Sequence, residues 1–177
     1  MCKISLKLLL IVTLLLTSPE ESNELIDTKV KTNYHYTTHN KYNYKETPIG
    51  TLIINKINLK KELYDINSKN NTIEKNVTIL KGSIDPSYNN SIFFIAAHSG
   101  NGKLAFFKNL DKLQINDEII LIYKNNKYTY HVNEILEQEK SSYIDVYKNT
   151  KKQLVLTTCS PTDKNKQLII NSTIKES

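Results

Sequence analysis

The sequence contains no arginine, only two cysteines and only one long apolar run in its 177 residues. All 24 basic side chains are therefore lysines, and the formal net charge is +6. Because these lysines are interleaved with acidic residues, they indicate a solvated basic surface, and we expect no nucleic-acid partner. No internal repeat or low-complexity block is present, and the length allows one ordinary domain plus an appendage.

The two cysteines, Cys2 and Cys159, lie on opposite sides of the long apolar run and form no CxxC motif, so we expect no disulfide between them. The four histidines also lack the spacing of metal ligands. His35 and His39 are four residues apart but lie in a polar stretch, where exposed side chains are the simpler interpretation. We therefore expect neither a metal nor a cofactor.

The N-terminus, residues 1–18, is expected to be a signal peptide or an N-terminal membrane anchor. Lys3 and Lys7 precede a short apolar block at residues 8–16, which is typical of an export signal. Whether the segment is cleaved or retained stays open. Residues 19–47 are polar and without periodicity, so we expect an extracytoplasmic stalk at the outer face of the cell membrane.

Residues 48–177 form the expected folded domain, which we predict to be mainly β. The β-rich runs are separated by turn signals, and residues 124–127 are typical of a hairpin loop. Short helical pieces are predicted at residues 72–77 and 105–113, the second with one apolar face. The expected strands occupy residues 49–57, 92–97, 118–123, 128–136, 153–158 and 167–170.

Cys159 ends a β-type run, Leu156-Thr157-Thr158-Cys159, and His98 lies upstream in Ala96-Ala97-His98-Ser99-Gly100. A thiol at the end of a buried strand is held rigidly and can meet an imidazole from another strand. This is the arrangement that nucleophilic Cys-His catalysis requires.

These motifs resemble those of the sortases, the extracytoplasmic cysteine transpeptidases of Gram-positive bacteria. The similar segments follow in family order over nearly all of residues 48–177, and include Ile49-Gly50-Thr51-Leu52, Lys81-Gly82-Ser83, Ala97-His98-Ser99-Gly100, Phe107-Lys108-Asn109-Leu110, Asn116-Asp117-Glu118-Ile119 and Leu156-Thr157-Thr158-Cys159. The resemblance implies a closed eight-stranded β-barrel with short helices. The compact length is most similar to the class D-like members.

The resemblance implies a catalytic set of His98, Cys159 and an arginine at the start of the last strand. Here Lys166-Gln167-Leu168-Ile169-Ile170 matches that region, so Gln167 occupies the position of the arginine. A glutamine amide can donate hydrogen bonds to an oxyanion, although it lacks the positive charge. Because successive strand residues point to opposite faces, Lys166 would replace it only after a register shift or a bulge.

The implied reaction cleaves an LPxTG-like sorting signal through a thioester at Cys159. The acyl group then passes to an amine of a peptidoglycan precursor or a pilin. Thr157, Thr158 and Ser99 are the expected substrate-binding residues.

Two alternatives remain at this point. The replaced arginine allows a catalytically impaired envelope-binding module that binds sorting signals or partner proteins. Another Cys-His enzyme is the second alternative, but a papain-like peptidase expects its cysteine before its histidine, and an L,D-transpeptidase expects a much closer spacing.

Overall fold

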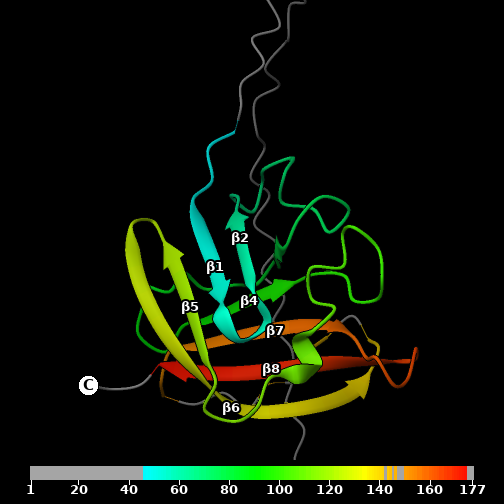
Figure 1. Cartoon of the computed structure of the whole chain (residues 1–177). Helices are drawn as coiled ribbons and strands as arrows, with labels where there is room; N and C mark the ends of the chain where they lie inside the picture. The colour runs from blue at the N-terminus through cyan, green and yellow to red at the C-terminus, as the bar shows by residue number, and fades with distance from the viewer. Residues whose placement is uncertain (1–45, 142, 145, 147–149, 175–177) are drawn as a thin grey trace, which may run out of the picture. The chain divides into compact units, whose positions relative to one another are not determined.

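The computed structural model describes residues 46–174 except 142, 145 and 147–149. The predicted segment 1–18 and nearly all of the stalk therefore lie outside the described residues. The described chain builds one eight-stranded sheet in the order β2-β1-β5-β6-β8-β7-β4-β3. The sheet curls into a nearly closed barrel, which confirms the predicted fold class (Figure 1).

The strands differ in length, and the last three along the chain, β6, β7 and β8, are the longest (Figure 1). β6 and β8 pair antiparallel, as do β7 and β8, whereas β4 and β7 run parallel. The strands are β1 (Gly50–Ile54), β2 (Leu59–Leu63), β3 (Thr78–Ile79), β4 (Ile92–Ala96), β5 (Glu118–Tyr123), β6 (Asn126–Glu139), β7 (Gln153–Cys159) and β8 (Lys166–Ile174).

The predicted hairpin loop is confirmed between β5 and β6. Tyr123 pairs with Asn126, so Lys124 and Asn125 form a two-residue turn. Both turn residues have positive φ, 47° and 67°, as the tight hairpin turns that match strand twist require.

The two edge strands, β2 and β3, each have backbone groups that bond to an asparagine side chain of the connection between them. The Asn76 amide donates to the Glu62 carbonyl on β2 at 2.7 Å. Asn71 accepts from the Ile79 amide on β3 at 2.7 Å and donates to the Ile79 carbonyl at 3.0 Å. These bonds satisfy edge groups that a fully closed barrel would pair between strands.

The barrel interior is filled by the side chains that point inward from each strand. On β7 the inward residues are Leu154 and Leu156, and on β8 they are Leu168 and Ile170. Burial of each such side chain contributes about 1.5–3 kcal/mol. The Tyr130 ring is fully buried in this core, and burial raises the pKa of its hydroxyl far above its usual range.

Both predicted helices are wrong as helices. Residues 72–77 form a single turn, in which the amides of Lys75 and Asn76 both donate to the Thr72 carbonyl. Residues 105–113 contain only the 3₁₀ helix η2 (Leu110–Lys112). A longer helix is interrupted because the Phe107 amide donates to the His98 carbonyl at 2.9 Å. The apolar face predicted there does pack into the core, through Phe107, Leu110 and Leu113.

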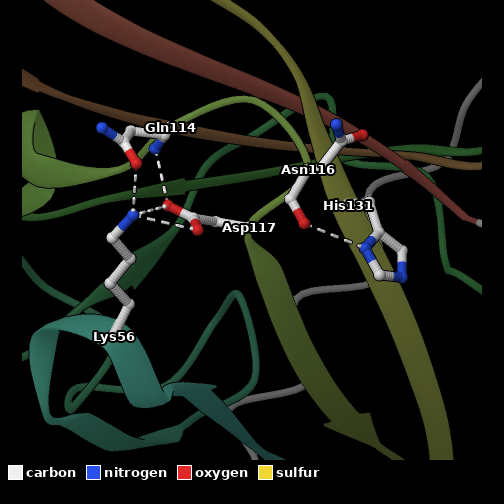
Figure 2. Close-up of polar contacts among 5 residues, drawn as sticks. All are labelled: Lys56, Gln114, Asn116, Asp117 and His131. Carbon is white, nitrogen blue, oxygen red and sulfur yellow. Dashed lines mark hydrogen bonds and ion pairs between the residues drawn. The ribbon is translucent and has the colours of Figure 1, made fainter.

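A polar cluster joins the 3₁₀ helix η1 (Asn55–Ile57) to the turn before β5 (Figure 2). Lys56 Nζ lies 2.9 Å from Asp117 Oδ2 and donates to Gln114 Oε1 at 2.9 Å. Asp117 Oδ2 also accepts a hydrogen bond from the backbone N–H of Gln114 at 2.6 Å, so the carboxylate caps this turn. On the neighbouring strand, His131 Nδ1 lies 3.2 Å from the Asn116 carbonyl (Figure 2).

In the part of the chain that the structure describes, no helix is long and apolar enough to cross a membrane.

Candidate active site

His98 and Cys159 are brought together by the parallel pairing of β4 and β7. The last registered pair of these strands is Ala96 with Thr157. His98 and Cys159 each lie two residues further along, and both are exposed. Because strand side chains alternate, His98 continues the face of Ala96 and Cys159 continues the face of Thr157. The two candidate residues therefore emerge side by side at the same end of adjacent strands.

Two side-chain hydrogen bonds hold these strand ends together beyond the backbone ladder, and a third bond fixes the His98 backbone. The Thr158 hydroxyl donates to the Ala97 carbonyl at 2.7 Å, in a buried position. The Ser99 hydroxyl donates to the Cys159 carbonyl at 2.9 Å. The third is the bond from the Phe107 amide to the His98 carbonyl. The backbone on each side of the imidazole and the thiol is thus fixed by its neighbours.

Thr158 and Ser99 use their hydroxyl groups within the protein. The Thr158 side chain faces the barrel interior, since it alternates with Thr157 and shares the side of Leu156. A direct contact of either hydroxyl with substrate stays a prediction.

Gln167 is the direct cross-strand partner of Cys159 on β8. Cross-strand partners project to the same side of a sheet, so the amide and the thiol share one face. Lys166, one residue earlier, projects to the other face. On the far side, Gln167 pairs with Gln138 of β6, which gives one row of Cys159, Gln167 and Gln138 across three strands.

The amide groups of this row are engaged by the connection between β6 and β7. Gln138 Nε2 donates to the Tyr143 carbonyl at 3.0 Å, and Gln167 Nε2 donates to the same oxygen at 3.4 Å. The bond from Gln167 is long, so it is the weaker of the two.

The next row along the same face is closed to solvent. Thr157 lies between Ala96 on β4 and Ile169 on β8 and is only 6% exposed. Its hydroxyl oxygen has no hydrogen-bond partner among the described residues. The floor beside the candidate nucleophile is therefore apolar apart from this one hydroxyl.

An acidic side chain, Glu74, lies close enough to His98 for their charges to interact. The pKa of the Glu74 carboxyl is lowered, first by the hydrogen bond from the Thr72 hydroxyl and to a smaller degree by the charge of His98. Glu74 belongs to the turn before β3 and is exposed.

The loop between β7 and β8 is held by its own polar network. The Ser160 hydroxyl donates to Glu137 at 2.5 Å and accepts from the amides of Thr162 and Asp163, both at 3.1 Å. The Ser160 amide donates to the Lys166 carbonyl at 3.0 Å. This loop therefore fixes the position of Gln167 relative to Cys159.

Two other kinds of site were considered among the described residues: a metal centre and the hollow beside His131. Within the described residues there is no group of three or more His, Cys, Asp or Glu side chains that could hold a metal ion. A hollow of about 630 Å³ lies beside His131 and is lined by Asn116, Asn133 and Thr173, among others. None of its lining residues is one of the predicted site residues.

The architecture and this site define a β-barrel with a cysteine and a histidine at the ends of parallel strands. Residues 52–174 match the family model described as "Sortase domain", which covers more than half of the chain. The chain therefore belongs to the sortase family, and its general activity is that of a sortase-type transpeptidase. A comparison with curated proteins found no match.

Solved sortase structures share the fold. Sortase C1 from Streptococcus agalactiae is 26% identical, with a TM-score of 0.64, over 73% of this chain and 68% of that chain. A lid mutant of sortase A from Corynebacterium diphtheriae is 21% identical, with a TM-score of 0.66, over 76% and 74% of the two chains. Sortase C from Streptococcus pneumoniae is 23% identical, with a TM-score of 0.65, over 73% and 67%.

Sequence reasoning predicted His98, Cys159 and Gln167 as site residues, which stays a prediction, but gave no sign of three of their neighbours. Tyr143 acts through its backbone carbonyl, which every residue carries, so no sequence signal could mark it. Gln138 could have been found only from the register of β6 against β8. Glu74 comes near His98 through the path of a turn.

Proposed function

We propose that this sortase cleaves an LPxTG-like sorting signal through a thioester at Cys159 and passes the acyl group to an amine. The observation that carries the proposal is the placement of His98 and Cys159 two residues beyond the last registered pair of β4 and β7, on one face. The Ser99 bond to the Cys159 carbonyl supports it, because it fixes the nucleophile against the histidine strand.

The chemistry runs in two acyl transfers. The Cys159 thiolate attacks a backbone carbonyl carbon of the signal, forming a tetrahedral oxyanion. The oxyanion collapses as the C–N bond breaks, and His98 gives a proton to the leaving amine. An incoming amine then attacks the thioester while His98 accepts its proton, and the thiolate leaves as the new amide forms.

Gln167 is the proposed side-chain donor to the oxyanion. It is the cross-strand partner of Cys159, and its amide carries two N–H donors. A neutral amide stabilises a developing negative charge less than a guanidinium does, because it contributes no net charge. We therefore expect turnover below that of a variant with arginine at this position.

The proposed setting is the outer face of the cell membrane of a Gram-positive bacterium. The apolar segment at residues 1–18 would anchor the chain, and residues 19–47 would act as a stalk. The proposed acyl acceptor is an amine of a peptidoglycan precursor or a pilin lysine. The Streptococcus pneumoniae sortase C structure is described in terms of pilin substrate specificity, which supports a pilin as one of the two. The class D-like assignment stays a prediction.

The test is transfer itself. Full-length protein in detergent is incubated with LPxTG-type peptides and a soluble amine, and the peptide products are identified by mass spectrometry. The proposal predicts a cleaved peptide joined to the amine, which is absent from Cys159→Ala and His98→Ala. A product that forms equally in Cys159→Ala would contradict it.

The second candidate is an envelope-binding module without turnover. The observation that favours it is Gln167, which lacks the charge of arginine and donates to the Tyr143 carbonyl. Peptide binding by the parent chain with no product in any buffer, and product in Gln167→Arg, would establish this candidate.

A further inference from the structure

The backbone carbonyl of Tyr143 receives hydrogen bonds from three side chains. The Ser141 hydroxyl donates to it at 2.7 Å, Gln138 Nε2 at 3.0 Å and Gln167 Nε2 at 3.4 Å. A backbone carbonyl oxygen has two lone pairs. The two shorter bonds therefore fill this acceptor, and Gln167 is left as the third and weakest donor.

The Tyr143 carbonyl is fixed by groups other than Gln167. The Ser141 hydroxyl also accepts from the Tyr143 backbone N–H at 3.1 Å, so Ser141 bonds to both backbone groups of this residue. The Tyr143 side chain is 76% exposed, and the described bonds of the residue are made by its backbone. The carbonyl is therefore a fixed acceptor beside the two glutamine amides.

The position of Gln167 in its row makes this acceptor matter for the chemistry. Gln167 pairs with Gln138 of β6 on one side and with Cys159 of β7 on the other. Neighbouring strands lie roughly 5 Å apart, so an amide drawn toward β6 moves away from the thiol. Because Gln138 reaches the same carbonyl, a firm bond to Tyr143 draws the Gln167 amide toward β6. An oxyanion at Cys159 would need that amide on the opposite side of β8.

We propose that Gln138 is a positioning residue. By occupying the Tyr143 carbonyl, Gln138 prevents this oxygen from capturing the Gln167 amide, which stays available to the oxyanion at Cys159. The inference rests on the proposed function, in which Gln167 is the oxyanion donor. Without Gln138, the Gln167 amide takes the vacated lone pair and has to break a full hydrogen bond before it reaches the oxyanion. The oxyanion exists only after the attack, so the cost falls on kcat rather than on KM.

The first measurement is steady-state peptide transfer by full-length protein in detergent. Gln138→Met keeps the length of the side chain but removes its donor. We expect kcat to fall about three- to tenfold, the equivalent of one net hydrogen bond, with KM unchanged. Ser141→Ala frees the other lone pair and should act in the same direction. Glu139→Ala is the matched control, because Glu139 is the next residue of β6 and projects to the opposite face. It should change kcat by less than about twofold.

A double substitution separates positioning from a general loosening of the connection between β6 and β7. In a Gln167→Ala background there is no amide to capture, so Gln138→Met should change kcat by less than about twofold. A residue that only stabilises the connection would lower kcat equally in both backgrounds.

The second measurement does not depend on turnover. The chain has four glutamines, so the side-chain NH₂ signals of ¹⁵N-glutamine-labelled protein can be assigned by substitution: Gln114, Gln138, Gln153 and Gln167. In Gln138→Met we expect the Gln167 amide proton to shift downfield, because its bond to the Tyr143 carbonyl shortens.

The results sustain or overturn the inference as follows. No shift of the Gln167 signal in Gln138→Met overturns it, as does an unchanged kcat or an equal loss in the Gln167→Ala background. Full activity of Gln167→Ala alone overturns the donor role on which the inference rests. A downfield shift in a chain that forms no transfer product would sustain the hold of Gln138 on the amide and overturn the proposed activity.

Discussion

Cys159 and Gln167 face each other across β7 and β8 as direct cross-strand partners. In this register Gln167 projects to the face that carries Cys159 and Lys166 does not, because neighbouring residues of β8 project to opposite faces. The Gln167 amide therefore lies on the same face as the thiol. Its current acceptor is the Tyr143 carbonyl at 3.4 Å.

Substitutions at Gln167 should change the chemical step. Gln167→Ala removes the proposed oxyanion donor and is expected to lower kcat by up to about 10²-fold, whereas Gln167→Arg should raise it above the parent. Lys166→Ala is the matched control and should change kcat by less than about twofold. Steady-state peptide transfer measures all three, and an equal loss in Lys166→Ala would contradict the assignment.

Ser99 should act on kcat rather than on KM. Its hydroxyl holds the Cys159 carbonyl at 2.9 Å, so Ser99→Ala loosens the nucleophile without removing a described substrate contact. We expect kcat to fall by about tenfold with little change in KM. Ser87→Ala removes a surface hydroxyl that bonds to Asp85 and serves as the control. A rise in KM at constant kcat would instead assign Ser99 to substrate binding.

Gly50 should tolerate no side chain. A Cβ at this position would lie 2.4 Å from the Ile122 carbonyl oxygen on β5, and both atoms belong to backbone. Gly50→Ala must therefore push β1 from β5, and we expect it to lower the free energy of unfolding by about 1–3 kcal/mol. Gly102→Ala, which meets nothing within 4 Å, is the control. Urea unfolding measures both, and equal stability of the two variants would contradict the prediction.

Acid should remove a contribution from Asp117. Burial acts to raise the pKa of this carboxyl, but the hydrogen bonds from Lys56 and the Gln114 amide, with the Lys56 charge, lower it below 3.8 (Figure 2). A lowered carboxyl pKa stabilises the fold above the unfolded value of 3.8, and this stabilisation is lost as the pH falls through the folded value.

The corresponding measurement is urea unfolding of the parent and Asp117→Asn at pH 7 and pH 3. The pair is partly exposed, so we expect a difference of about 0.5–1 kcal/mol at pH 7. The difference should shrink at pH 3. Asp111→Asn, an exposed carboxylate of η2, controls for general charge effects. A difference that stayed constant with pH would show that ionisation of Asp117 is not its source.

Hydrophobic alternation and turn signals were sufficient to predict six of the eight strands, but not the two edge strands β2 and β3. In β2 the inward-facing residue Lys61 is charged, which breaks the apolar alternation. Its ammonium group lies 3.7 Å from the centre of the Phe106 ring. Such a cation-π contact depends on tertiary structure, which local sequence does not reveal. The helix expected at residues 105–113 does not form, again because of a tertiary contact: the backbone N–H of Phe107 donates to the His98 carbonyl.

The candidate residues were predictable because their motifs lie at strand ends, where the fold exposes side chains. Their partners were not. Which face carries Gln167 follows from the pairing of β7 with β8, and the contact with Tyr143 follows from the path of a connection. Long-range register is set by many small packing energies that no short motif contains.

The most direct test is intact mass spectrometry of the full-length chain mixed with an LPxTG-type peptide. We expect an added mass equal to the acyl fragment, located at Cys159 by peptide mapping, absent from Cys159→Ala and discharged by hydroxylamine or a soluble amine. We also expect the adduct to form faster in Gln167→Arg. Peptide cleavage with no acyl adduct on Cys159, under conditions that trap thioesters, would contradict the proposed thioester.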